Sequence, residues 1–328
     1  MKNFIVSGDQ HISVKKDIPI AWQLGRYRML FKSLVALCKE YKADLILAGD
    51  LLHQSRPNLH ETMLALELFA LLDAEGVETH IIAGNHCGLG ALGTTLDYFD
   101  SVFETSNFIT YYPTVDSIFS GNTELVFVGH NQIQNWLDAG DTEWKGTRVV
   151  FSHFRPTVNF FIQEEIDVQK FLGTGDHFFL SDIHDNFDLA ENAIYTNAPL
   201  NNHFEPHPKC GCLLVTLDAG EVSHKRIPLT LPNLIQIDTT AEKFEDTLDT
   251  FNFYRISVTG TPEDLRQIKT ESPNTKLLKI PELQDTYVES EVVEEVKNQS
   301  LQEALVGYMQ ELNYTEEKIA EMIGVLHE

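Results

Sequence analysis

The chain has 328 residues, of which 43% are hydrophobic and 10% aromatic, enough for one large domain and a smaller one. Its formal net charge of −25 argues against a protein that holds nucleic acid through its overall charge, although bound divalent metals can reverse the sign locally. No apolar run approaches the ~18 residues that span a membrane, and the start of the chain does not resemble a signal peptide. Four cysteines without zinc-site spacing favour a reduced, intracellular protein.

The first third of the chain alternates between two kinds of pattern. Apolar runs at 3–9, 43–50 and 77–86 each end in polar residues, which is typical of buried strands. Helical periodicity separates them at 23–41 and 58–75. Strand, helix, strand, helix, strand predicts a parallel α/β arrangement, in which ligands gather at the carboxyl ends of the strands.

Four further apolar runs, at 124–130, 147–153, 176–184 and 211–218, again end in histidine or aspartate, and a fifth follows at 221–229. They predict additional strands of the same domain.

The remaining chain has a different character. Residues 253–280 predict a small strand–helix–strand unit, and 298–327 carry two helical patterns. We therefore expect three parts: 1–232, 233–290 and 291–328.

Polar residues stand at the ends of the predicted core strands in a recurring order. Any one of them could be a simple turn or cap residue, but their joint occurrence indicates a metal centre. The set is Asp9, His11, Asp50, Asn85, His86, His153, Asp182 and His184. Carboxylate, imidazole and amide groups suit manganese, iron or zinc, and the hard oxygen donors favour Mn²⁺ or Mg²⁺. Two such ions can activate water and stabilise charge at phosphorus.

This order of motifs resembles the calcineurin-like metallophosphoesterase superfamily. Within it, the sequence is most similar to the SbcD-type nuclease subunit of DNA repair and recombination complexes, including phage exonucleases. The stretch "GDLLHQSRPN", with His53, and the stretch 194–218 carry the closer resemblance. It implies a β-sandwich flanked by helices, a small α/β capping domain at 233–290 that contacts DNA, and C-terminal helices.

The resemblance also implies roles for individual residues. One metal is held by Asp9, His11 and His184, and Asp50 bridges both metals. The second metal is held by Asn85, His153 and Asp182. His86 stabilises the transition state or protonates the leaving oxygen, and His53 assists near the scissile phosphate or orients the DNA. The later loop, with Tyr195, Asn197, Asn201 and His203, approaches the substrate.

Two positions depart from the family pattern. Cys87 replaces the usual aspartate that orients the catalytic imidazole, and losing such a group costs ~10–100-fold in activity or metal affinity. Asp182, in Ser181-Asp182, replaces an imidazole ligand and favours harder metals; alternatively, it caps a turn.

The resemblance implies a metal-dependent DNA nuclease subunit, with 3′-to-5′ exonuclease and single-strand endonuclease activity on DNA. It also implies an SbcC-type, SMC-like ATPase partner, gripped by an apolar stripe within 291–328 (Leu301, Leu305, Tyr308, Met309 and Leu312), and a homodimer formed through the first two helices. The stripe could instead pack on the chain's own domain.

Two other functions stay open. The acidic charge suits a calcineurin-like phosphatase or a nucleotide phosphodiesterase with the same metal core. The altered positions 87 and 182 also suit a catalytically weakened scaffold subunit, although a scaffold has no physical need for convergent ligand-type residues.

Overall fold

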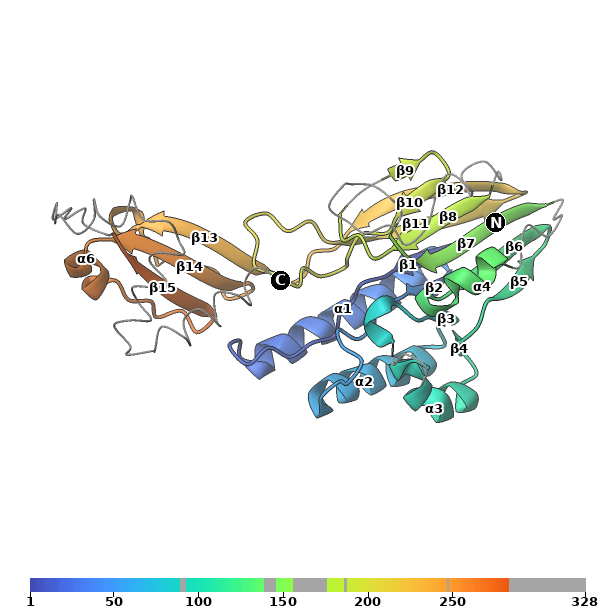
Figure 1. Ribbon diagram of the computed structural model, residues 1–328, viewed down its shortest axis with the longest axis horizontal. Coiled ribbons are helices and arrows are strands. Elements are labelled where there is room, and N and C mark those ends of the chain that lie inside the picture. Colours follow the sequence, from blue (N-terminus) through green and yellow to red (C-terminus); the bar gives the residue numbers. More distant parts are fainter. Residues whose placement is uncertain (89–92, 139–145, 156–175, 186–187, 247, 283–328) are drawn as a thin grey trace, which may run out of the picture. The chain divides into compact units, whose positions relative to one another are not determined.

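The computed structural model describes residues 1–88, 93–138, 146–155, 176–185, 188–246 and 248–282 (Figure 1). The chain divides into two units, 1–280 and 281–328. The predicted C-terminal helices of the second unit lie outside the described residues. No helix in the described ranges is long and apolar enough to cross a membrane.

The first of three sheets contains the three N-terminal strands that the sequence predicts. Its six strands follow the order β12-β11-β1-β2-β3-β4. They are β12 (Glu221–Pro228), β11 (Gly211–Asp218), β1 (Lys2–Ser7), β2 (Ala43–Ala48), β3 (Thr79–Ile82) and β4 (Ile109–Tyr112). Strands β1 to β4 are parallel neighbours, and β11 pairs antiparallel with β1. The predicted parallel α/β arrangement is confirmed.

A second six-stranded sheet follows the order β5-β6-β7-β8-β10-β9. Its strands are β5 (Asp116–Ser120), β6 (Thr123–Val128), β7 (Thr147–His153), β8 (His177–Ser181), β10 (Ala193–Tyr195) and β9 (Asp188–Ala190). The central strands β6, β7, β8 and β10 run parallel. Their carboxyl ends therefore meet at one edge, as in the first sheet.

The two sheets pack face to face, and helices cover the outer face of the first sheet (Figure 1). Side chains alternate along each strand: Phe4 and Ile46 join the inter-sheet core with Phe151, whereas Ile5 and Leu45 face the helices. Both faces are buried, so the strands read as continuous apolar runs. The covering helices are α1 (Ile20–Tyr41), α2 (Leu59–Glu75) and α3 (Asp100–Thr105).

Local sequence signals determine where α2 begins and ends. Asn58 accepts hydrogen bonds from the backbone of His60 and Glu61, and the Glu61 carboxylate accepts one from the Asn58 N–H, which completes a capping box. Gly76 ends the helix in a left-handed conformation. The predicted span of this helix agrees to within one residue.

Shorter elements complete the two-sheet unit. They are α4 (Ile133–Asp138) and the 3₁₀ turns η1 (Asn85–Cys87), η3 (Thr95–Phe99) and η4 (His130–Gln132). Of these, η1 carries candidate site residues.

A third sheet begins at Leu234, with the order β13 (Leu234–Thr240), β14 (Phe253–Gly260) and β15 (Thr275–Pro281). The helix α6 (Pro262–Gln267) and the 3₁₀ turn η5 (Ala241–Lys243) accompany it. Tyr254, Ile256 and Val258 form a separate small core. The strand–helix–strand prediction for 253–280 matches these elements. Because this sheet belongs to the same compact unit as the rest of 1–280, a domain boundary at 232/233 stays a prediction.

Candidate metal centre

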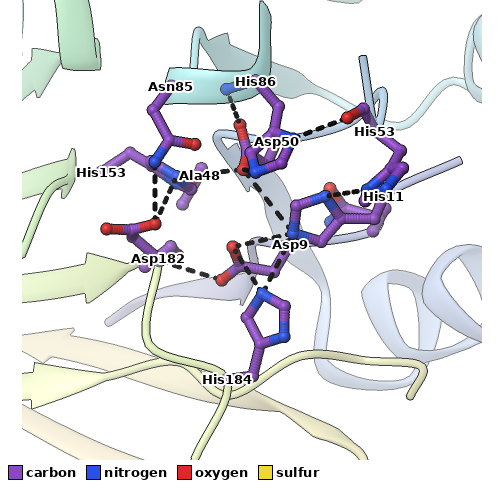
Figure 2. A network of polar contacts seen from close by, with 12 residues as sticks. Asp9, His11, Ala48, Asp50, His53, Asn85, His86, His153, Asp182 and His184 are labelled. Atoms are coloured by element: carbon purple, nitrogen blue, oxygen red, sulfur yellow. Dashed lines mark hydrogen bonds and ion pairs between the residues drawn. The ribbon is translucent and has the colours of Figure 1, made fainter. Parts of the chain in front are cut away.

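The candidate ligands come from the carboxyl ends of five parallel strands in two sheets. The polar residues follow β1, β2 and β3 in the first sheet; in the second, one ends β7 and the others follow β8. Figure 2 shows their side chains turned toward one another. The residues brought together are Asp9, His11, Asp50, Asn85, His86, His153, Asp182 and His184.

Unusual backbone conformations mark this edge. The described part of the chain has seven non-glycine residues with positive φ, and five are predicted site residues: Asp9, His11, Asp50, Asp182 and Asn197. A left-handed conformation costs a non-glycine residue of order 1–3 kcal/mol and clusters at functional sites. The strained backbone at these residues therefore sets the direction of their side chains.

Two glycines allow the strand ends to approach the ligands closely. A Cβ atom on Gly84 would lie 2.1 Å from Asp50 Oδ1, and one on Gly49 would lie 2.3 Å from His153 Nδ1. Gly49 also has a φ of +90°. The Gly-Asp and Gly-Asn pairs thus have a steric reason: any side chain on either glycine would displace a candidate ligand.

One cluster joins Asp9, His11 and His184. His11 Nε2 and His184 Nε2 lie 3.0 Å apart, and each lies 3.5–3.6 Å from Asp9 Oδ1. Burial alone would raise the pKa of Asp9, but its contacts with the two histidines lower it well below its usual range. The three ligand atoms face a common point, the arrangement expected around a cation.

A second cluster joins Asp50 and His153 to Asp9. Asp50 Oδ2 lies 3.4 Å from His153 Nε2 and 3.6 Å from His11 Nε2, so this one oxygen stands between both clusters. The predicted bridging role of Asp50 stays a prediction, and this placement suits it. His153 Nδ1 lies 3.0 Å from the carbonyl oxygen of Ala48, which directs the lone pair of Nε2 toward Asp50.

The residues present fit a bound metal. Among the described residues, four buried acceptor atoms at this edge have no hydrogen-bond partner: Asp9 Oδ1, Asp50 Oδ2, Asn85 Oδ1 and His153 Nε2. Buried polar atoms without partners are costly, and bound cations would satisfy such atoms. Although burial disfavours a charged imidazole, the nearby carboxylates raise the pKa of His153 to about 10. The pocket therefore attracts positive charge.

His86 and His53 stand beside the ligands. Their rings stack with centroids 5.2 Å apart, and His86 Nε2 lies 3.9 Å from Asp50 Oδ2. Burial, with His11 and His86 nearby, lowers the pKa of His53 to about 4, so this ring is neutral at neutral pH. The His86 backbone N–H donates to Asp50 Oδ1, which ties the turn to the centre.

The expected role of residue 87 is corrected. The Nδ1 atom of His86 lies 2.6 Å from the carbonyl oxygen of His53, so a backbone group orients the imidazole. Cys87 is fully buried and belongs to the hydrophobic core against the helices, where burial raises its thiol pKa to about 12. Cysteine at this position is a core residue, and its presence does not leave the imidazole without support.

Asp182 is placed at the centre but has other partners. Arg155 donates to both of its carboxylate oxygens, at 2.5 and 3.1 Å, and Asn85 Nδ2 lies 3.1 Å from Oδ1. The backbone N–H of Asp182 donates to Asp9 Oδ2. Arg155 was not predicted; the only sequence signal is a basic residue two positions after a strand-end histidine.

The later loop separates into structural and cavity-lining residues. Tyr195 is fully buried and donates to the Phe154 carbonyl, and Asn201 bonds Arg26 and the backbone of Leu234. Asn197 is buried and donates to the Lys209 carbonyl. The approach of this loop to the substrate stays a prediction, and the Tyr195 hydroxyl itself is engaged in the core.

Two cavities adjoin the candidate ligands. One, of about 210 Å³, is lined by the three rings of His11, His53 and His86, together with Arg155 and His184. The other, of about 320 Å³, is also lined by His184 and by His203 and Lys209. His184, Asn202 and His203 line both cavities, which are therefore neighbours. Of the predicted loop residues, His203 lines both cavities and Asn201 lines the larger one.

Comparisons with known proteins were made for the whole chain. The calcineurin-like phosphoesterase family matches residues 2–178, more than half of the chain. A comparison with curated protein sequences finds no match.

Three solved structures show a low overall similarity. The protein TT1561 of Thermus thermophilus is 11% identical (TM-score 0.44), covering 69% of this chain and 98% of its own. An archaeal phosphodiesterase is 9% identical (TM-score 0.36), covering 69% and 99%. The purple acid phosphatase PPD1 of yellow lupin, Lupinus luteus, is 14% identical (TM-score 0.37), covering 69% and 51%.

Proposed function

The chain belongs to the calcineurin-like phosphoesterase family, and we propose that it is the nuclease subunit of an SbcCD-like DNA recombination and repair complex. The coarser function, metal-dependent hydrolysis of a phosphoester, follows from the family. The proposal adds DNA as the substrate, 3′-to-5′ exonuclease polarity and Mn²⁺ as the native ion. Polarity comes from the resemblance of the sequence motifs alone.

One observation carries the hydrolytic part of the proposal. Four buried polar atoms without hydrogen-bond partners belong to candidate ligands at this edge, and His11 and His184 from the same edge line an accessible cavity. A purely structural site would have satisfied these atoms with internal donors. The same observation argues against a metal-free scaffold, because the unpartnered buried atoms would destabilise a fold that binds no metal.

The chain's own residues divide the chemical work. Asp9, His11, Asp50, Asn85, His153 and His184 would hold divalent ions, which supply Lewis-acid activation and charge stabilisation when bound. His86 reaches the cavity with Nε2, because Nδ1 is engaged by the His53 carbonyl. A proton held at Nε2 can pass to the leaving oxygen. The neutral His53 ring stacks on His86 and limits its rotation.

Cationic side chains around the cavities support a polyanionic substrate. Arg155 and Lys209 line the two cavities, and the Lys15 ammonium contacts the carbonyl oxygen of Asn202, which lines both. They stand out in a chain with a net charge of −25. Because Asp182, Asp185 and Glu205 line the same cavities, bound divalent ions would have to supply the net positive charge that receives DNA.

A small-nucleotide phosphodiesterase is the second candidate. The cavity of about 320 Å³ beside the centre falls in the range of small-molecule sites. Hydrolysis of a chromogenic phosphodiester without any cleavage of DNA would favour this candidate over the nuclease.

Two partner proposals accompany the nuclease. The ATPase subunit would bind the segment 291–328, whose predicted apolar stripe lies outside the described residues. A homodimer would form through the first two helices, where Met29 on α1 and Leu59 and Met63 on α2 are exposed. Light scattering of the purified chain tests the dimer, and co-purification with the ATPase tests the first proposal.

The deciding experiment uses end-labelled duplex DNA with Mn²⁺. We expect wild-type protein to shorten the labelled strand and His86→Ser to lose at least ~10²-fold of that rate while still binding metal. His60→Ser is the matched control, because His60 is an exposed histidine on α2. Equal rates for wild type and His86→Ser would contradict the role of His86. Absence of DNA cleavage by metal-loaded wild type would contradict the nuclease.

A further inference from the structure

A bidentate ion pair stands on the wall of the metal-site cavity. Arg155 Nε lies 2.5 Å from Asp182 Oδ2, and Arg155 Nη2 lies 3.1 Å from Asp182 Oδ1. The Asp182 side chain is 4% exposed, whereas that of Arg155 is 39% exposed. Both residues line the cavity, and the guanidinium is the more exposed of the two groups.

Asp182 Oδ1 lies 3.7 Å from His153 Nε2, but the carboxylate is engaged by other partners. Both of its oxygens accept from Arg155, and Oδ1 also accepts from Asn85 Nδ2. In the described part of the chain, three groups of ligand atoms converge to within 4.8 Å, and none includes Asp182. The four unpartnered acceptor atoms likewise belong to other residues. Its hydrogen-bonding capacity is used to hold the arginine.

We propose that Arg155 binds the non-bridging oxygens of the substrate phosphate, and that Asp182 is the positioning residue that holds it there. The phosphate would sit in the cavity between the guanidinium and the ligand cluster of His11 and His184, whose side chains line the same cavity. This inference rests on the phosphoester hydrolysis proposed above but does not depend on the substrate being DNA.

The chemistry of the pair supports this assignment. A guanidinium is planar and carries several N–H donors in a fork, and the contacts with Asp182 fix the plane of the Arg155 group. That fork matches phosphate oxygens, and its charge persists at every accessible pH. The pair itself is neutral, so the negative charge that attracts metal stays on Asp9 and Asp50. One aspartate therefore fixes a cation near the substrate without weakening the metal-binding cluster.

The test measures binding of inorganic phosphate to the full-length, Mn²⁺-loaded protein by calorimetry, together with the number of bound Mn²⁺ ions by elemental analysis. We expect Arg155→Gln to raise the Kd for phosphate about 10- to 100-fold with unchanged Mn²⁺ content, since a charged hydrogen-bonding partner is lost. Arg155→Lys should recover part of the affinity, because it keeps the charge but not the fork. Asp182→Asn should weaken phosphate binding and leave the Mn²⁺ content unchanged.

Arg28→Gln is the matched control. Arg28 makes the same two-point contact, with Glu67, at 2.6 and 2.8 Å, but on the surface of α1 and α2. It should leave the phosphate Kd unchanged. An unaltered Kd in Arg155→Gln would overturn the role of Arg155. Loss of one Mn²⁺ in Asp182→Asn would overturn the positioning role of Asp182 and make it a ligand. Neither readout uses DNA, so a protein that binds phosphate as expected but cuts no DNA would refute only the nuclease proposal.

Discussion

The two sheets contribute to the same centre by different means. Residues after β1, β2 and β3 are held by the backbone: His11 N–H donates to the Asp50 carbonyl, and His86 N–H donates to the Asp50 carboxylate. The segment after β8 is held partly by a side-chain ion pair, in which Arg155 grips Asp182. His153 differs again, because it is the last residue of β7 itself.

This difference predicts how strongly each position depends on the path of the local chain. The position of some ligands is fixed by backbone hydrogen bonds and left-handed turns. Such a ligand depends on the path of the local chain, so replacing it disturbs the whole turn. A position held by a side-chain pair depends less on the path of the chain and more on the partner side chain. Asp182 combines both means, because it also has a positive φ and its backbone N–H donates to Asp9 Oδ2.

Among the residues after β1, β2 and β3, which we call the backbone-held half, replacement of Asp50 should have the largest effect. Its Oδ2 stands between His11 and His153, and its Oδ1 accepts from His86 N–H. We expect Asp50→Asn to lower Mn²⁺-dependent hydrolysis by well over ~10²-fold, more than the loss of a group that only supports a ligand. Initial rates at saturating Mn²⁺, with bound metal measured in parallel, provide the check.

Asp116→Asn is the control for that change, because Asp116 is an exposed aspartate on β5, outside the metal centre. It should retain full activity. Normal metal content and a normal hydrolysis rate in Asp50→Asn would show that Asp50 is not part of the metal centre. That result would also contradict the contrast between the two halves.

Residue 87 tests whether the backbone alone holds the catalytic imidazole. Cys87 is fully buried in the core, and Asp50 lies close enough to disfavour a second negative charge. We expect Cys87→Asp to lower the free energy of unfolding by about 3–5 kcal/mol through an uncompensated buried charge, without raising activity. Chemical denaturation and initial rates measure the two effects.

Cys87→Ser provides the neutral comparison, since it alters the side chain without adding charge. It should keep the hydrolysis rate close to that of wild type, because the His53 carbonyl still orients His86. Faster hydrolysis by Cys87→Asp would restore the hypothesis that a carboxylate at position 87 supports the imidazole.

Most of the fold and the ligand set could be predicted from sequence for a simple reason. Apolar runs that end in Gly-Asp or Gly-Asn-His carry both signals at once: a buried strand and a polar carboxyl end. Parallel strands then bring those ends to one edge. Asp9 and Asp50 were identified in this way, and His153, which converges with them, was identified as the last residue of the apolar run 147–153.

The remaining features depend on three-dimensional neighbours. Nothing near Cys87 in the sequence shows that the backbone of His53, 34 residues earlier, takes over the support of His86. The Arg155–Asp182 pair likewise joins residues 27 positions apart. Tyr195 could not be assigned to the core without knowing that its hydroxyl meets the Phe154 carbonyl. Each of these depends on a contact between distant segments that periodicity does not encode.

Gly84 tests the steric side of the contrast, with the smallest expected effect. An alanine Cβ at Gly84 would lie 2.1 Å from Asp50 Oδ1 and 2.3 Å from Asp50 N, so the turn or the ligand must move. We expect Gly84→Ala to lower the free energy of unfolding by about 1–3 kcal/mol, the usual cost of overpacking, and to reduce metal affinity as Asp50 is displaced.

Gly25→Ala is the matched control: it lies within α1 with no atom within 4 Å of the new Cβ, so it should stabilise the protein by roughly 0.5–1 kcal/mol. Thermal unfolding with and without Mn²⁺ separates the two cases, because only Gly84→Ala should lose part of the metal-dependent rise in Tm. An equal rise in both variants would mean that the first-sheet turns tolerate movement, and the rigidity ascribed to the backbone-held half would then be refuted.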